Sequence, residues 1–108
     1  MGDEMTPKHW TQAELDLKIY SMKASPKFQR FSFAGAVLCN LEIKDCTFFN
    51  VNFTGTNMAG CRFTNVKFLG NCRFDRTCMV YCNFKNVIGI DLNTKGLILT
   101  PTQPKEPK

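Results

Sequence analysis

The sequence is poor in the residues and spacings that build most active and metal sites. It has a single histidine, His9, and none of its six cysteines forms a Cys-x-x-Cys pair, so we expect no zinc site and no other metal site. It also lacks a glycine-rich phosphate loop, a Ser-His-Asp arrangement and paired buried carboxylates. We therefore expect no catalysis and no cofactor, which leaves binding or structural roles.

Long apolar runs and basic clusters are absent as well. No stretch approaches the roughly 20 apolar residues that a membrane-spanning helix needs, and the first ten residues, MGDEMTPKHW, lack the apolar core of a signal peptide. We therefore expect a cytoplasmic protein with reduced cysteines and no membrane contact. The net charge of +5 is spread along the chain, which fits either simple solubility or attraction to an acidic partner.

A period of five residues dominates the sequence from Phe31 onward. Written in fives, it reads FSFAG AVLCN LEIKD CTFFN VNFTG TNMAG CRFTN VKFLG and, after one inserted residue at Asn71, CRFDR TCMVY CNFKN. Two positions before each centre the residues are mostly small or β-branched, and two positions after it they are mostly Gly, Asn or Asp, which tolerate turns and positive φ. The centres, which we expect to form the core, are Phe33, Leu38, Ile43, Phe48, Phe53, Met58, Phe63, Phe68, Phe74, Met79 and Phe84.

Neither a helix nor a straight strand can use such a period. In an α-helix five residues advance by about 500°, so the centres would scatter around the axis. In a continuous strand side chains alternate, so an odd period would turn successive centres to opposite faces. A corner after every five residues solves both problems, and four such sides close a coil of about 20 residues whose neighbours pair at about 4.8 Å. The sequence thus predicts an all-β, right-handed, quadrilateral parallel β-helix of about three coils with an apolar interior.

This pattern resembles the pentapeptide repeat family over residues 31–86. The family consensus has Ala two positions before the centre and Leu or Phe at the centre, whereas Cys, Val and Thr often replace the Ala here. The resemblance implies a rigid solenoid whose side walls dock on other macromolecules. It also implies that a homodimer can form through the C-terminal end, and that some relatives imitate double-stranded DNA and bind type II topoisomerases.

Segments outside the repeat are expected to close its ends. The motif TQAE from Thr11 to Glu14 is a capping box, and Trp10 and Leu15 flank it as a hydrophobic staple, so a short N-terminal helix should cover the first coil. After the last repeat, apolar residues are available to close the final coil or to pair with a second copy. The predicted segments are a flexible N-terminus (1–10), a capping helix (11–24), the repeat (26–92), a C-terminal cap or dimer segment (93–100) and a disordered tail (101–108).

The outward positions supply the candidate binding residues. In this register Phe49 stacks over Leu69 beside Lys67, and Arg73 and Arg76 follow on the next side. An exposed apolar pair with basic neighbours is typical of a docking patch. Alternatively, the N-terminal segment folds over Phe49 and Leu69 and covers them.

Two other features have both a functional and a plain interpretation. The inserted Asn71 is either a bulge that marks a functional place or a tolerated corner insertion. Cys39 and Cys78 point outward two coils apart and are candidates for a reactive role. The other four cysteines stand at inward positions, where a small apolar group fits.

Three classes of function remain. The leading hypothesis is a non-catalytic protein-interaction module, such as a small phage or bacterial inhibitor that docks on host machinery. A DNA-mimicking modulator of DNA gyrase or another topoisomerase needs an acidic surface, but the repeat is net basic and only Glu42, Asp45 and Asp75 qualify. The third class is a nucleic-acid-binding protein, whose binding would depend strongly on salt, or a structural oligomer.

Overall fold

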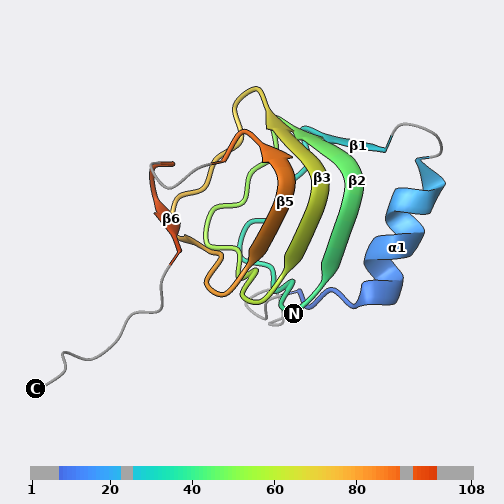
Figure 1. Ribbon diagram of the computed structural model, residues 1–108, viewed down its shortest axis with the longest axis horizontal. Coiled ribbons are helices and arrows are strands. Elements are labelled where there is room, and N and C mark those ends of the chain that lie inside the picture. Colours follow the sequence, from blue (N-terminus) through green and yellow to red (C-terminus); the bar gives the residue numbers. More distant parts are fainter. Residues whose placement is uncertain (1–7, 23–25, 91–93, 100–108) are drawn as a thin grey trace, which may run out of the picture.

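In the computed structural model, which describes residues 8–22, 26–90 and 94–99, the repeat winds into a parallel β-solenoid of about three turns (Figure 1). One short helix lies near the N-terminus, so the predicted fold class is confirmed. Residues 8–10 were expected to be flexible, but His9 forms a parallel bridge with Val37 and adds a rung to the first coil. The predicted tail and the first seven residues lie outside the described residues.

The described strands stack in parallel from coil to coil. Phe48 pairs with Phe68, 20 residues further on, whereas Phe63 pairs with Phe84, 21 residues further on, because Asn71 intervenes. Four strands form one sheet in the order β1-β2-β3-β5, and two short strands, β4 and β6, pair separately. The bounds are β1 Lys27–Gln29, β2 Glu42–Phe49, β3 Arg62–Leu69, β4 Thr77–Cys78, β5 Asn83–Ile88 and β6 Leu97–Ile98.

The corners are left-handed turns stabilised by asparagine side chains. Asp45, Asn65 and Asn86 stack on one corner with φ near +55°, a region that Asn and Asp tolerate better than most residues. The Asn86 amide donates to Oδ1 of Asn65 at 2.6 Å, and the Asn65 amide donates to Oδ1 of Asp45 at 2.9 Å. At the next corner, the backbone N–H of the inserted Asn71 donates to Oδ1 of Asn50 at 2.7 Å. The insertion thus lengthens one corner without breaking the strand pairing on either side.

Stacked phenylalanine rings fill the interior. Phe33, Phe53 and Phe74 lie face to face, with ring centroids 5.6 and 5.4 Å apart. Every predicted core residue from Phe33 to Met79 is buried. Phe84 is the exception: its ring stacks on the preceding coil, but 39% of its surface is exposed because no further coil of the described chain covers its other face. The prediction that Phe84 belongs to the core was therefore wrong.

Polar inward residues explain why this repeat departs from alanine two positions before the centre. The buried hydroxyl of Thr56 donates to the carbonyl of Phe33 at 2.7 Å, and that of Thr77 donates to the carbonyl of Phe53 at 2.6 Å. The thiol of Cys61 makes an equivalent bond to the coil before it at 2.8 Å. The carbonyls of Phe33 and Phe53 also accept from the backbone N–H groups of Ala36 and Thr56, so each threonine hydroxyl finds a buried partner by adding a second bond to such an oxygen.

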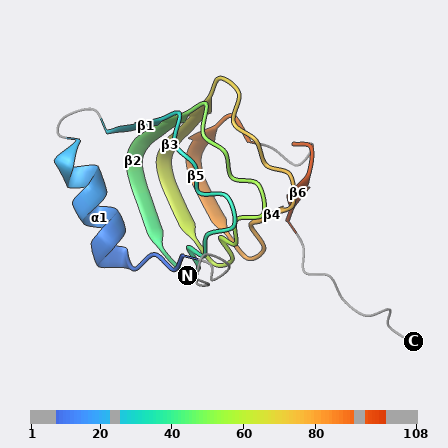
Figure 2. The same ribbon diagram turned by 180° about the vertical axis from the view of Figure 1, so that it is seen from behind.

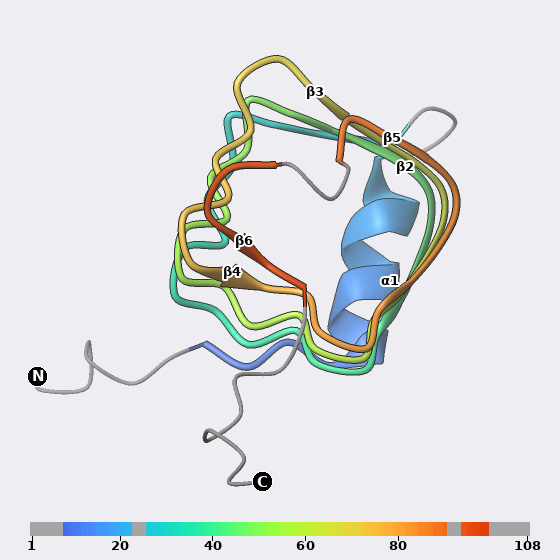
Figure 3. The same ribbon diagram turned by 60° about the vertical axis from the view of Figure 1, so that its left-hand side comes forward.

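The two ends of the solenoid carry different caps, and Figure 2 shows α1 and β6 at opposite ends. Helix α1 (Gln12–Ser21) begins at the predicted capping box and ends before the predicted limit of residue 24, with Met22 as C-cap. Figure 3 shows α1 lying across the open end of the first coil, where Leu15 is completely buried. At the other end, β6 extends only the side that carries β4.

Candidate protein-binding surface

One outer wall of the solenoid combines apolar and basic side chains. We call it the Leu69 wall. Its two outward rows are aligned by the strand register, which places each residue over its partner in the next coil. The rows are Lys27, Thr47, Lys67 and Ile88 in one, and Gln29, Phe49 and Leu69 in the other.

The centre of the Leu69 wall is apolar and accessible. Leu69 and Ile88 are 40% and 48% exposed. Phe49 is half-buried, and the ammonium of Lys27 lies 5.5 Å from the centre of its ring, which is a cation–π distance. Lys67 stands beside Leu69 on the same strand. Neither lysine takes part in an ion pair of the described residues, so both charges are available to a partner.

The corner before Asn71 leaves room for the Phe49 ring. Gly70 has a φ of +70°, and a Cβ atom at this position would lie only 3.0 Å from Cε1 of Phe49. A side chain here would therefore both strain the backbone and press on the ring. Glycine lets the corner close beside Phe49.

The five predicted binding residues are not all on one surface. Phe49, Lys67 and Leu69 share the Leu69 wall, but Arg73 pairs with Asn52 on the adjacent wall beyond the Gly70 corner. Arg73 also forms a 3.5 Å ion pair with Asp75. Arg76 occupies the following corner with a φ of +57°. The structure therefore brings three of the five together.

Helix α1 lies beside β2 at the N-terminal end and not over the Leu69 wall (Figures 1 and 3). The alternative in which the N-terminal segment covers Phe49 and Leu69 is thus wrong for residues 8–22. Two members of the wall, Lys27 and Ile88, were missed because they lie just outside the eleven regular repeats. Extending the period backward from Thr47 and forward from Lys67, with one residue added for Asn71, would have found both.

The buried cysteines are structural. Burial raises the pKa of the Cys46 thiol to about 12, with a smaller contribution from the charge of Asp45. A hydrogen bond between the thiols of Cys61 and Cys82, together with burial, raises the pKa of Cys61. Burial also raises the pKa of Cys72. These thiols are therefore poor nucleophiles near neutral pH.

Neither a metal site nor a membrane span is present in the described part of the chain. Among residues 8–22, 26–90 and 94–99, no three His, Cys, Asp or Glu side chains gather closely enough to hold a metal ion. Over the same ranges, no helix is long and apolar enough to cross a membrane. Cys39 and Cys78 are half-buried on an outer wall, and all six cysteines are free thiols.

These features define a solenoid repeat protein in which the interior is occupied by packed side chains and the outer walls are left for contacts. The comparisons with known proteins specify the class further. The family model for pentapeptide repeats (9 copies) matches residues 43–88, so this part of the chain carries pentapeptide repeats. Members of the family are often protein-interaction modules. A search of curated proteins found no match to the sequence.

Proposed function

We propose that the protein is a non-catalytic interaction module that docks through the Leu69 wall on a protein with an apolar groove and an acidic rim. The observation that carries this proposal is the exposure of Leu69 and Ile88 on adjacent coils, flanked by the unpaired lysines Lys27 and Lys67. Apolar side chains surrounded by polar ones are typical of protein interfaces. A small phage or bacterial inhibitor of host machinery in the cytoplasm, where free thiols persist, would use such a surface.

Site-specific photo-crosslinking tests this proposal. A benzophenone amino acid at position 69 is expected to capture one protein partner, whereas the same probe at Thr54, on the adjacent wall, is expected to capture much less. Leu69→Glu should abolish capture by a probe at Gln29, since it places a charge in the apolar centre of the wall. Equal yields from positions 69 and 54, or capture that survives Leu69→Glu, would reject the Leu69 wall as the docking surface.

The distribution of acidic groups does not favour DNA mimicry. Glu42 lies 3.5 Å from a guanidinium nitrogen of Arg62, and Asp75 is paired with Arg73 at the same distance. Asp45 accepts a hydrogen bond at a corner. The potentials of the first two carboxylates are partly cancelled, and the three do not form a stripe like a phosphate backbone. We therefore rank inhibition of DNA gyrase below protein docking.

A homodimer through the C-terminal end is a second candidate, favoured by the exposed Phe84. Strand β5 is the last strand of its sheet, so its outer edge has no neighbour among the described strands. Such edges pair readily with a second copy. Light scattering should then give twice the monomer mass, and Phe84→Glu should return the protein to a monomer. A wild-type monomer at high concentration would reject the dimer.

A further inference from the structure

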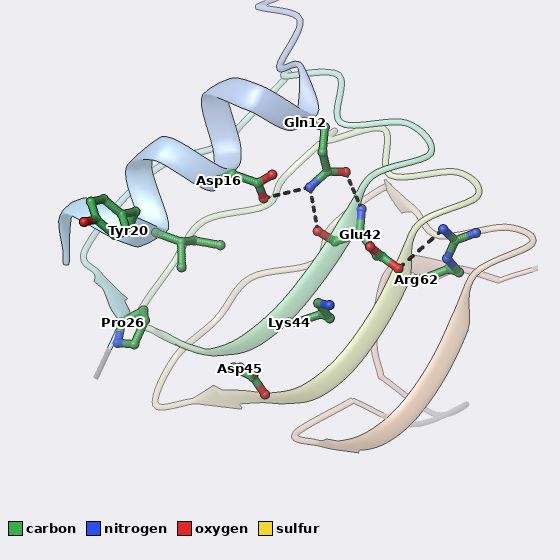
Figure 4. A pocket seen from close by; sticks show the side chains of 9 residues that line it. Gln12, Asp16, Tyr20, Pro26, Glu42, Lys44, Asp45 and Arg62 are labelled. Carbon is green, nitrogen blue, oxygen red and sulfur yellow. Dashed lines mark hydrogen bonds and ion pairs between the residues drawn. The ribbon is translucent and has the colours of Figure 1, made fainter. Parts of the chain in front are cut away.

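A groove of about 590 Å³ lies between α1 and the first half of β2, away from the Leu69 wall (Figure 4). Asp16, Ile19 and Tyr20 line it from the helix, and Pro26 and Lys44 line it from the first coil. The groove exists because the chain forms the helix α1 here and does not follow the winding of the solenoid. On the wall where β2 begins, a helix therefore stands where an earlier coil would otherwise supply a strand.

A glutamine side chain takes the place of that strand at one point. The Gln12 amide donates from Nε2 to the carbonyl of Glu42 at 2.9 Å and accepts from the Glu42 N–H at 2.8 Å. Both backbone groups of Glu42 therefore face the groove. Strand β1 begins to pair with β2 only at Thr47, opposite Lys27. Between these points, the edge of β2 has no strand partner within the described chain.

The open position on this edge is Lys44. In a strand the backbone groups of alternate residues point to the same edge. Because the N–H and C=O of Glu42 face the groove, those of Lys44 face it too. An unpaired N–H and C=O on a strand edge form a template for another extended segment. The groove thus offers backbone pairing as well as side-chain contacts.

The lining of the groove indicates the chemistry of the occupant. Figure 4 places Asp16, Glu42 and Arg62 toward one end and Tyr20 and Pro26 toward the other. The lining carries three carboxylates and two cations, and the pair between Arg62 and Glu42 at 3.5 Å leaves the carboxylates of Asp16 and Asp45 against the single cation of Lys44. The other end presents the apolar surfaces of Ile19, Tyr20 and Pro26, with Asp45 near Pro26, and Tyr20 is 81% exposed. A segment with a basic side chain near an aliphatic one matches both ends.

We propose that this groove binds an extended peptide segment with alternating basic and aliphatic residues, which pairs with the backbone of Lys44 as an added strand. The carboxylate of Asp16 receives a basic side chain, and Ile19, Tyr20 and Pro26 receive an aliphatic one. This site is separate from the Leu69 wall, so it stands whether or not that wall docks on a partner.

The test is a titration of the full ¹⁵N-labelled chain with the peptide acetyl-Lys-Val-Lys-Val-Lys-amide, followed by NMR. The Lys44 amide signal should move downfield and its hydrogen exchange should slow. Methylating the peptide's central amide nitrogens should weaken binding about tenfold, because the donor to the Lys44 carbonyl is lost and the added methyl groups obstruct pairing along the strand edge. Replacing the peptide's lysines with glutamates should also weaken binding.

Two exposed tyrosines provide matched variants. Tyr20→Asn should weaken binding severalfold, while Tyr81→Asn, which alters a 73% exposed side chain at a distant corner, should leave it unchanged. Neither side chain is buried, so both variants should fold. The proposal is overturned if the Lys44 amide does not respond, if the methylated or glutamate peptide binds as well as the parent, or if the two variants behave alike.

Discussion

The two ends of the solenoid are closed in different ways. At the N-terminal end α1 lies across the coil (Figure 3), and Phe28 and Phe33 of the first coil are each only 2% exposed. At the C-terminal end β6 adds a rung to one wall, and Phe84 remains 39% exposed although its ring stacks 5.2 Å above Phe63. A repeat specifies the coils between its ends, because each coil there has a neighbour on both sides. The ends depend on the segments that the repeat does not encode.

The largest expected loss of stability distinguishes the middle coil from the open C-terminal end. Phe53 is completely buried between stacked rings, so Phe53→Ala should lower the free energy of unfolding by about 3–5 kcal/mol. Phe84→Ala should cost clearly less, since part of that ring is already in water. Urea denaturation followed by circular dichroism measures both. Equal losses would mean that another part of the chain, or a second copy, covers Phe84 in solution.

The next comparison concerns the two caps themselves. Leu15 of α1 is fully buried, and Leu15→Ala should cost about 2–5 kcal/mol. Leu97 of β6 is only partly buried against the core, so Leu97→Ala should cost less. Leu17→Ala, which removes a 68% exposed side chain from the same helix as Leu15, should change stability by no more than about 0.5 kcal/mol. If Leu97→Ala is the more damaging cap variant, the C-terminal cap holds the solenoid more strongly than its burial indicates.

The sequence predicts the middle of the molecule better than its ends, for a physical reason. Alternation between corners determines which side chains point inward, so the period alone placed Phe53 in the core and Asn65 at a corner. The exposure of Phe84 depends on the chain beyond the last coil, where no period operates. The bonds between Gln12 and Glu42, and with them the groove, join residues 30 positions apart through a helix that only the fold positions.

The thiols should make stability depend on alkaline pH, and differently in the first and last coils. Burial in the folded protein raises the pKa of the Cys46 thiol to about 12, whereas the same thiol in the unfolded chain has a pKa of about 8.5. The contribution of this thiol is thus complete below about pH 8.5 and is lost as the pH rises toward 12. Cys46→Val should make the decline shallower.

Cys82→Val is the matched variant in the last coil. The hydrogen bond between the two thiols lowers the pKa of the half-buried Cys82 and raises that of Cys61, so Cys82→Val removes two opposed effects and should leave the alkaline decline in place. Urea titrations between pH 8 and pH 11 give the two slopes. A flatter slope in Cys82→Val than in Cys46→Val would contradict this expectation, because it would mean that the Cys61 thiol, whose pKa the lost bond raises, contributes more to the decline than Cys46 does.

The smallest expected loss of stability comes from removing the N-cap of α1, and it should be confined to the N-terminal end. Thr11 caps α1 by accepting from the N–H of Glu14 at 3.1 Å, while the Glu14 carboxylate accepts from the Thr11 N–H at 2.9 Å. Thr11→Ala removes the first bond and should cost about 1 kcal/mol, because Leu15 and Gln12 still hold the helix against the first coil. Hydrogen exchange should then speed up in α1 and at Glu42, while the β5 amides keep their wild-type rates. Thr11→Ser, which restores the acceptor oxygen, should return both regions to wild-type exchange. Faster exchange in β5 would show instead that the two ends unfold together. The two caps would then differ only in how their side chains pack, and neither end would unfold independently of the other.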